Sequence, residues 1–593
     1  MKFNSKYSLC LLLFLLTSCG TGGFNFKNWF SEKEKNEKKS KSNKYRLGPL
    51  RKKSGYFKDV TAKYGLPGIK ATHIYAVDFN SDGWTDLVVL PEFFSRPEFY
   101  YFSPRKKKFL RLWYSPFKKN MKASFLNFVD FDNDGIMDVI VGVLNQKTEI
   151  TKSPLIIFRG YLKKKKLSYG RAFTFPGKPR PISSATVLDY NLDGKLDLFV
   201  SNWYGPGKYG PAITPDQLFF GEGFRFKDVS GALKEENKRD GREGPYVNAK
   251  PTYGALNCDI DGNHYPDILT VSSDGFANKV WMNVYNKKLR ARSFENAGNI
   301  SNFGADSQGD YDLRGGGRTF GLDCIDYNGD GIMDTFLGEL SHSYDNENRD
   351  RSSILTGSRR KFPPKFVRTQ YYDDQGLTNW SQGDRRGTFF DYNFDGLVDL
   401  IVDNTGFPPK SRLVLFEQEK NHAFKDIAVR AGIDILNPSG TVIMDFNKDG
   451  KPDIVTGQTS IRAGNIKRSI YLFENQLPRK RRRSLRFFPK GVWSNAAGIG
   501  ARIVLKTNKR VQTKYVHYSH GGLPSQNERG VFFGLSKNEK VVFAKVYWPY
   551  KKKGKPFVRK YKLSKLKFKK FLNLTLCEIG DAKKGRFAKC PKK

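Results

Sequence analysis

A nine-residue acidic motif that occurs seven times constrains this chain more than any other feature. The motif is Asp-x-(Asn/Asp)-x-Asp-Gly-x-x-Asp, and successive copies start 52 to 70 residues apart. A repeat with such a period indicates one supersecondary unit that recurs and packs against its neighbours. The fourth copy departs from the pattern, with Asn263 and His264 in place of Asp-Gly. The seven copies begin at Asp78, Asp130, Asp189, Asp259, Asp326, Asp391 and Asp445.

Short apolar runs follow these motifs, as in Leu87–Leu90 and Leu198–Val200. They are too short for helices and are bounded by turn residues, so they predict buried strands. A unit of this length holds about four strands with their loops, which is one blade of a β-propeller. We therefore predict an all-β fold with a seven-bladed propeller over residues 56–478; six or eight blades are the alternatives. A weaker Phe-Lys-Asp repeat predicts an outer strand at Phe57, Phe226 and Phe424.

The spacing of oxygen-bearing side chains predicts a metal site in each loop. Positions one, three, five and nine carry side-chain oxygens, and position seven offers its backbone carbonyl. Hard cations such as Ca²⁺ prefer such ligands, and Mg²⁺ tolerates flexible loops less well. Glycine at position six permits the sharp turn. The alternative is a set of metal-free turns, but three or four converging carboxylates would repel one another without a cation.

We expect up to seven Ca²⁺ ions, with the loop at Asp259 weaker or empty. The predicted ligands are Asp78, Asn80, Asp82, Trp84 and Asp86; Asp130, Asp132, Asp134, Ile136 and Asp138; Asp189, Asn191, Asp193, Lys195 and Asp197; Asp259, Asp261, Asn263, Tyr265 and Asp267; Asp326, Asn328, Asp330, Ile332 and Asp334; Asp391, Asn393, Asp395, Leu397 and Asp399; and Asp445, Asn447, Asp449, Lys451 and Asp453.

Two other calcium folds do not fit these loops. An EF-hand closes its loop with Glu at position twelve, whereas this chain has residues such as Val89, Val141 and Leu337 there. A nonapeptide β-helix would need a repeat every nine residues. The loops instead resemble the FG-GAP/VCBS repeats of integrin-α-type propellers, a resemblance that covers about residues 56 to 478 and implies calcium in loops between strands.

A second module follows at residues 487–580, after a basic linker at 479–486 and before a basic tail at 581–593. Its short alternating strands and Gly turns predict a small β-rich domain. It resembles the ASPIC/UnbV domain, and its combination with the propeller resembles the cartilage acidic protein (CRTAC)-like family. Leu523-Pro524 stands where that family usually has Gly-Tyr, and the family implies no defined activity. The resemblance rests on Asn495–Ala501, Ser525-Gln526, Phe533-Gly534-Leu535 and Trp548-Pro549.

The N-terminus predicts export and a lipid anchor. Residues 1–18 have a basic start and an apolar core too short to span a bilayer. The core ends in Leu16-Thr17-Ser18-Cys19, which resembles a bacterial lipobox with Cys19 as the lipidated residue; an ordinary secretory signal is the alternative. Residues 19–55 predict a charged, flexible tether. We expect a lipid-anchored protein of the bacterial cell envelope, at the outer membrane or the cell surface.

Four cysteines remain after export and lipidation: Cys258, Cys324, Cys577 and Cys590. Disulfides are common in exported proteins, and four cysteines permit three pairings. The sequence leaves the pairing open, although Cys577–Cys590 would staple the C-terminal tail and Cys258–Cys324 would link neighbouring repeats.

The net charge of +44 hides an uneven distribution. The seven loops contain 22 of the 59 carboxylates, which leaves 37 to face 103 Lys and Arg. Basic runs at Lys163–Lys166, Arg479–Arg483 and Lys551–Lys553 suit anionic envelope lipids or polysaccharides; an ordinary solvated surface is the alternative. Export makes nucleic acid an unsuitable partner.

No catalytic motif is present, and we predict no catalytic or cofactor-binding residue. The predicted function is a calcium-binding, lipid-anchored binding or adhesion module that recognises a protein or a glycan. The alternative is an enzyme that acts on an envelope or extracellular glycan through a pocket on the propeller face, because the propeller fold supports both functions.

Overall fold

The structure is a computed structural model of the whole chain. It describes residues 55–591 except 119–120, 145–154, 176–179, 208–209, 239–245, 247, 274, 306–316, 343–349, 371–380, 407–409, 479–481 and 520. Strands dominate the described residues, whose helices are a 3-10 turn, η1 (Ser230–Ala232), and one α-helical turn, α3 (Ala428–Ala431). The predicted all-β class is therefore confirmed. The signal, Cys19 and the tether lie outside the described residues, apart from Gly55.

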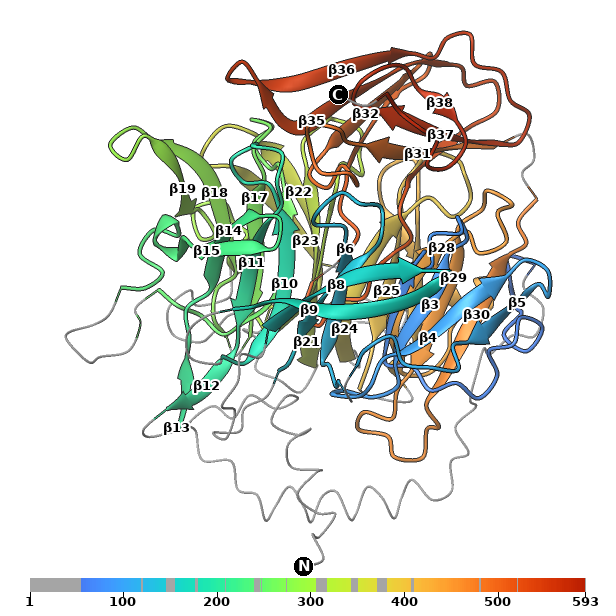
Figure 1. Cartoon of the computed structure of the whole chain (residues 1–593), viewed down its shortest axis with the longest axis horizontal. Coiled ribbons are helices and arrows are strands. Elements are labelled where there is room, and N and C mark those ends of the chain that lie inside the picture. Colours follow the sequence, from blue (N-terminus) through green and yellow to red (C-terminus); the bar gives the residue numbers. More distant parts are fainter. Residues whose placement is uncertain are drawn as a thin grey trace, which may run out of the picture.

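Four-stranded antiparallel groups form the first part of the chain (Figure 1). Each group pairs its strands mainly in sequence order, and a small additional hairpin accompanies the third group. The groups are β2 (His73–Val77), β3 (Asp86–Leu90), β4 (Glu98–Ser103) and β5 (Lys108–Arg111); β6 (Phe125–Val129), β7 (Asp138–Gly142), β8 (Leu155–Lys163) and β9 (Lys166–Thr174); β10 (Ile182–Leu188), β11 (Asp197–Asn202), β14 (Gln217–Glu222) and β15 (Arg225–Asp228), with the hairpin β12 (Tyr204–Gly207) and β13 (Gly210–Ile213); β16 (Thr252–Cys258), β17 (Asp267–Ser272), β18 (Lys279–Asn286) and β19 (Ala291–Asn296); β20 (Thr319–Ile325), β21 (Asp334–His342), β22 (Ser353–Arg359) and β23 (Lys365–Gln370); β24 (Ser381–Phe390), β25 (Asp399–Asn404), β26 (Leu413–Gln418) and β27 (Phe424–Asp426); and β28 (Pro438–Met444), β29 (Asp453–Gln458), β30 (Ser469–Asn475) and β1 (Phe57–Asp59).

The connections show why the acidic motifs recur. Every motif lies in the turn between the first and second strands of a group, and its ninth residue begins the second strand. The first strands of neighbouring groups lie against one another, as β10 does with β16 and β2 with β28. The described residues thus form the β-propeller that the FG-GAP resemblance implies, whereas the count of seven blades stays a prediction.

Strand β1 joins the two ends of the propeller. It comes from the N-terminal side of the sequence and pairs with β30, the third strand of the last group, with Phe57 opposite Asn475. The Phe-Lys-Asp repeat therefore marks edge strands, because β15 and β27 are also the outermost strands of their groups. This prediction is confirmed.

Both disulfides of the structure join cysteines that the sequence places in comparable or nearby positions. Cys258–Cys324 links β16 to β20, the first strands of two neighbouring groups, and Cys577–Cys590 ties the C-terminal tail to the strand that precedes it. The structure thus has the pairing in which one disulfide closes a short C-terminal loop and the other bridges two blades.

The C-terminal domain consists of two four-stranded sheets, ordered β34-β31-β37-β38 and β33-β32-β35-β36. Its first strand begins at Arg483, inside the segment for which the sequence predicts a linker, because Leu485 and Phe487 are buried in the domain core. Part of the predicted tail is also structured, as β38. The strands are β31 (Arg483–Lys490), β32 (Arg502–Thr507), β33 (Val511–Tyr515), β34 (Val531–Leu535), β35 (Val541–Lys552), β36 (Lys555–Lys562), β37 (Phe571–Cys577) and β38 (Lys583–Lys584).

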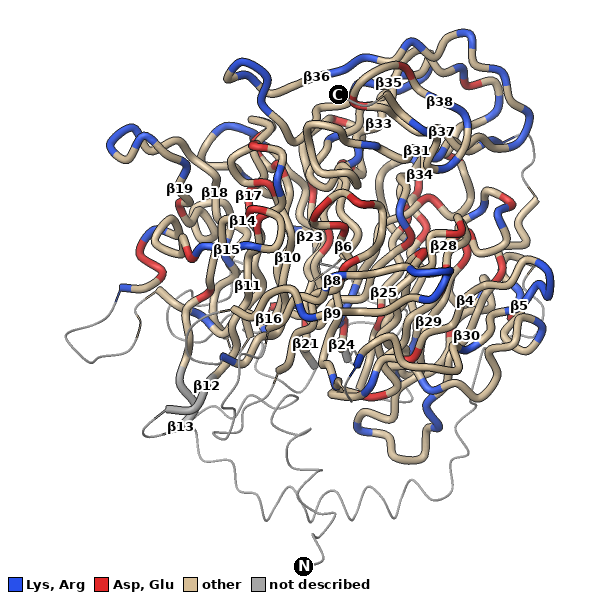
Figure 2. The backbone as a smooth tube through the Cα atoms, in the orientation of Figure 1, with Lys and Arg blue, Asp and Glu red and all other residues tan. Residues whose placement is uncertain are grey.

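This domain lies on the side of the propeller that carries the acidic loops. Figure 1 shows its strands stacked above the propeller, and Figure 2 shows Asp and Glu gathered beneath them. The two parts are in direct contact: Ser484 donates a hydrogen bond to the carbonyl of Gly450 (3.0 Å), and the Lys551 N–H donates to that of Leu192 (3.0 Å).

A loop of the C-terminal domain, residues 517–528 of which all but 520 are described, enters the middle of the propeller. The Gln526 side chain donates to the carbonyl of Phe128 and accepts its N–H, at 3.0 and 2.8 Å. The loop contacts the first strand of every group through hydrogen bonds, a β-bridge or an ion pair. These partners are Ile74, Phe128, Ser183 and Ser184, Gly254, Asp323, Arg386 and Ile443.

Gly522 marks the closest approach between the loop and the propeller. A Cβ atom at this position would lie 2.1 Å from the Tyr253 ring and 2.7 Å from the Tyr253 carbonyl oxygen. Real Cβ atoms do not approach so closely, and the backbone on both sides leaves little room to move. The loop therefore requires glycine here for space.

We predict that Gly522→Ala lowers the free energy of unfolding by about 1–3 kcal/mol, the usual cost of overpacking a closely packed contact. Gly464→Ala is the matched control, because a Cβ there meets no atom within 4 Å. Differential scanning calorimetry of both variants measures the difference. Equal melting temperatures would contradict the close packing of this loop.

Candidate metal centres beneath the C-terminal domain

The seven acidic loops share one pattern of backbone hydrogen bonds. In each loop the N–H of position six donates to the carboxylate of position one, at 2.8–3.2 Å. The N–H of position seven donates to the side chain of position five, at 2.7–2.9 Å. These bonds wrap the chain around the side chains of positions one and five, so their oxygens lie on the inside of the loop.

The aspartate at position nine fixes the loop to the sheet behind it. In all seven groups one of its carboxylate oxygens accepts a backbone N–H at 2.8–2.9 Å from the third strand or its edge, as Asp86 does from Phe102. These seven aspartates are all buried. Position nine therefore has a structural role in addition to its predicted role as a ligand.

Several loop carboxylates keep an unsatisfied oxygen. Among the described residues, one oxygen of each of Asp86, Asp130, Asp391 and Asp453 is buried and has no hydrogen-bond donor. Leaving a buried carboxylate oxygen without a partner is costly. An oxygen-seeking cation would supply that partner, so these residues fit the predicted metal.

Two loops bring three carboxylates close enough to share an ion. Ligand oxygens of Asp130, Asp132 and Asp138 lie within 4.8 Å of one another, as do those of Asp259, Asp261 and Asp267. In the first of these loops Arg159 forms ion pairs with Asp132 (2.5 Å) and Asp134 (3.4 Å). The loop at Asp259, expected to be the weakest, thus has the same convergence of carboxylates as the loop at Asp130.

The loop at Asp259 differs in its surroundings. His264 adopts the left-handed conformation of the glycine it replaces (φ 76°), and its ring stacks on Tyr547 of the C-terminal domain. The Arg502 guanidinium of that domain lies 3.4 Å from the Asp259 carboxylate. A cation of the chain itself therefore already offsets part of the negative charge in this loop.

The loop at Asp445 faces an ion-pair network from the C-terminal domain. Arg586 contacts Asp445 at 2.9 Å and Glu528 at 2.8 Å, and Arg486 contacts Glu528 at 2.8 Å. Glu528 accepts the N–H of Asp445 (2.7 Å) and the hydroxyl of Thr85 at the end of the first loop. Glu528 thus joins the first and last acidic loops where the propeller closes.

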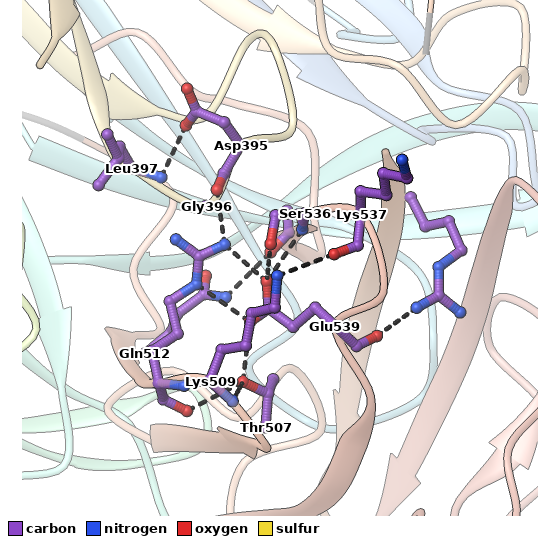
Figure 3. Close-up of polar contacts among 12 residues, drawn as sticks. Asp395, Gly396, Leu397, Thr507, Lys509, Gln512, Ser536, Lys537 and Glu539 are labelled. Carbon is purple, nitrogen blue, oxygen red and sulfur yellow. Dashed lines mark hydrogen bonds and ion pairs between the residues drawn. The ribbon is translucent and has the colours of Figure 1, made fainter. Parts of the chain in front are cut away.

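A third contact links the loop at Asp391, through Asp395, to the turn between β32 and β33 (Figure 3). The Arg510 guanidinium donates to the carbonyl of Asp395 and forms two hydrogen bonds to the Glu539 carboxylate, at 3.0 and 2.7 Å. Glu539 also accepts hydrogen bonds from Ser536 and Thr507, at 2.8–2.9 Å. The loop is therefore held by an arginine whose own position is fixed.

Sequence reasoning named the loop residues but missed these partners. The one sequence signal for a partner was the position of Glu528, which ends the Ser525–Glu528 segment shortly after Gly521-Gly522. Arg486, Arg502, Arg510 and Arg586 are scattered among 33 Lys and Arg of residues 479–593. Without the docked domain, nothing distinguishes them from surface cations.

Burial beneath the domain perturbs the loop carboxylates. Burial raises the pKa of Asp78, Asp130 and Asp326 to about 6, partly offset by hydrogen bonds or neighbouring cations. It raises the pKa of Asp138 to about 7 and that of Asp334 to about 8. In the metal-free protein these groups hold protons more tightly than they would in the unfolded chain.

This shift predicts an unusual pH dependence. Between pH 4 and 8 the folded metal-free protein binds more protons at these sites than the unfolded chain, so its free energy of unfolding falls as pH rises. We expect the melting temperature in excess chelator to be higher at pH 5 than at pH 8. Because Ca²⁺ competes with these protons, added Ca²⁺ should raise the melting temperature more at pH 8. A metal-free protein that becomes more stable from pH 5 to pH 8 would contradict this expectation.

Comparison with known proteins agrees with the two parts of the chain. Residues 130–200 and 391–456 match the FG-GAP-like repeat, and residues 491–574 match the ASPIC and UnbV family. A T-cell immunomodulatory protein homolog of Plasmodium falciparum is 25% identical over 306 residues, which is 48% of this chain. The chain spans only 37% of that relative's length.

Solved structures show weaker similarity. The crystal structure of BBS1N in complex with ARL6DN has a TM-score of 0.36 at 9% identity, over 72% of this chain and 98% of the other. Saccharomyces cerevisiae Sqt1 has a TM-score of 0.38 at 8% identity, over 67% and 82%. Similarity at this level identifies no shared function. The sequence matches and the fold together show that this chain carries FG-GAP-like repeats followed by a C-terminal ASPIC/UnbV domain.

Proposed function

We propose that the protein is a calcium-binding, lipid-anchored binding module outside the cytoplasm, which recognises a protein or a glycan. The observation that carries the calcium proposal is the repeated loop with buried carboxylate oxygens that lack a donor. The proposed ligands are those that the sequence predicts, positions one, three, five and nine with the carbonyl of position seven. No described feature specifically favours an enzyme.

Bound Ca²⁺ would neutralise the loop carboxylates. The residues that would hold it also connect three parts of the molecule. Position-one aspartates such as Asp259 and Asp445 pair with arginines of the C-terminal domain, position five shapes the turn, and position nine holds the sheet. Neutralisation would therefore stabilise both the blades and the docking of the domain above them. Calcium acts here on the rigidity of the scaffold rather than on a reaction.

The proposed location outside the cytoplasm rests on the types of domain and on the disulfides. FG-GAP-like repeats, an ASPIC/UnbV domain and two disulfides suggest an extracellular or secreted protein. In the part of the chain that the structure describes, we find no helix with the length and hydropathy needed to cross a bilayer. A lipid on Cys19 would supply the membrane attachment that we propose.

We predict that removal of calcium lowers the melting temperature. Binding to the folded state alone stabilises it by RT ln(1 + [L]/Kd), about 2.7 kcal/mol per site at 100 times Kd. A melt in excess EGTA should therefore begin well below a melt in millimolar Ca²⁺, and Mg²⁺ should restore less stability than Ca²⁺. Identical melts in the three conditions would reject the calcium proposal.

A single-loop variant tests the ligands. Asp78→Asn should remove one bound Ca²⁺ per chain in equilibrium dialysis, whereas Asp581→Asn, at an exposed position in the C-terminal tail, should leave the number unchanged. The same number of ions in all three proteins would show that Asp78 is not a ligand.

Cys19→Ala should release the protein from the membrane fraction of the producing bacterium, because the lipid can no longer be attached. Cys10→Ala, inside the predicted signal, is the matched control and should leave the protein in that fraction. Fractionation followed by immunoblotting measures both. Membrane retention of Cys19→Ala would reject the lipid anchor.

A further inference from the structure

The C-terminal part of the chain carries most of the net positive charge of the protein. Residues 479–593 contain 33 Lys and Arg but only four acids, Glu528, Glu539, Glu578 and Asp581. The first two pair with arginines, and Glu578 accepts the backbone N–H groups of Val492 and Trp493 at 2.6 and 2.7 Å. Almost nothing on the outer surface of this domain offsets its cations.

The propeller adds cations on the same side. In an antiparallel group, the turn between strands three and four lies on the same side as the turn between strands one and two, which carries the acidic motif. Arg360 confirms this placement, since it donates to the carbonyl of Gly331 in an acidic loop. The exposed basic turns belong to the first, second, fourth and fifth groups and comprise Arg105–Lys108, Lys163–Lys166, Lys287–Arg290 and Arg359–Lys361.

Negative charge on this side is either buried or confined to a few positions. Six of the seven position-one aspartates and all seven at position nine are buried, whereas Asp82, Asp134 and Asp330 at position five are exposed. The equivalent turns of the third and sixth groups carry Glu222 and Glu419. Figure 2 shows the resulting separation, with Lys and Arg along β35, β36 and the outer turns and Asp and Glu beneath them. We name the exposed cations of the C-terminal domain together with the four basic turns the cationic face.

The cationic face favours a polymer over a membrane. Its exposed large apolar residues are few and scattered: Val542, Val558 and Phe587 in the C-terminal domain, each 37–40% exposed, and Leu289 and Phe362 in two basic turns, at 65% and 42%. Lysines of the β35–β36 hairpin cover aromatic rings instead: the Lys552 ammonium is 4.5 Å from the Trp493 ring and that of Lys560 is 3.9 Å from the Phe543 ring. In the described part of this domain the most exposed aromatic side chain is that of Phe587, at 38%, so none projects fully as an anchor for lipid insertion.

We propose that the cationic face binds an acidic polysaccharide, a chain with closely spaced carboxylate or sulfate groups. The inference deepens the proposed function, because it names the class of ligand that the exported binding module recognises. A long polyanion can contact the domain and the basic turns at once, and each neutralised charge releases counterions. A lysine-rich surface suits such a ligand, because a polyanion binds through many surface contacts and needs no single deep pocket.

The test measures binding of heparin, a sulfated uronate polymer, to the full chain in millimolar Ca²⁺ and at several salt concentrations. The face variant is Lys552→Gln, Lys553→Gln and Lys555→Gln. The matched control is Lys70→Gln, Lys238→Gln and Lys467→Gln, which removes the same charge from exposed lysines in connections on the opposite side of the propeller. We expect the face variant to weaken binding about tenfold and to reduce the slope of log affinity against log salt by about 2–3. The control should change affinity less than about twofold.

Three results would overturn the inference. They are no heparin binding at about 0.15 M salt, equal losses in both variants, and binding to vesicles with 20% anionic phospholipid but not to heparin. Melting curves on the same samples separate this inference from the calcium proposal. Heparin binding without stabilisation by Ca²⁺ would reject only the calcium sites, and stabilisation by Ca²⁺ without heparin binding would reject only the polysaccharide.

Discussion

Buried carboxylates between two domains are the constraint on which this structure depends. Each acidic loop places aspartates within the blade or beneath the C-terminal domain, and burial, together with repulsion from neighbouring loop aspartates, raises the pKa of Asp86 and Asp189 well above the usual range. An uncompensated buried charge is strongly destabilising. Backbone N–H donors within the loops and arginines of the C-terminal domain compensate part of this negative charge. The oxygens that remain unsatisfied are those for which a divalent ion is the natural partner.

The same contact makes the propeller and the ASPIC/UnbV domain one structural unit. The loop 517–528 occupies the middle of the propeller, where many propellers have an open channel, and Gln526 bonds both polar groups of the Phe128 backbone. The channel opening on this side is therefore not available to a ligand. Recognition must therefore use the outer surfaces of the docked assembly, including that of the C-terminal domain which covers the motif-bearing loops.

The local structure could be predicted from the sequence because each copy of the motif marks a turn and each apolar run marks a strand. The motif spacing located the first-to-second-strand turns, and the apolar runs after Asp86 and Asp197 became buried strands, since both depend on residues close in sequence. The docking of the C-terminal domain depends instead on pairs such as Arg586 with Asp445, 141 residues apart. A lone arginine in a basic tail carries no sign of such a partner. The linker boundary was misplaced for a similar reason: Arg483–Arg486 looks solvated in sequence, yet Leu485 belongs to the domain core.

The distribution of charge suggests why the surface is so basic. Docking required a few cations, namely Arg486, Arg502, Arg510 and Arg586, and these are largely buried or paired with acids. Lys551 also takes part, since its N–H donates to the Leu192 carbonyl. Most other lysines of β35, β36 and the outer turns take no part in that docking, and their mutual repulsion opposes the compact state. Bound Ca²⁺ would make the protein more positive still. The fold does not need this excess of exposed Lys and Arg on the cationic face. The proposed acidic ligand explains the excess, because it would supply the missing negative charge.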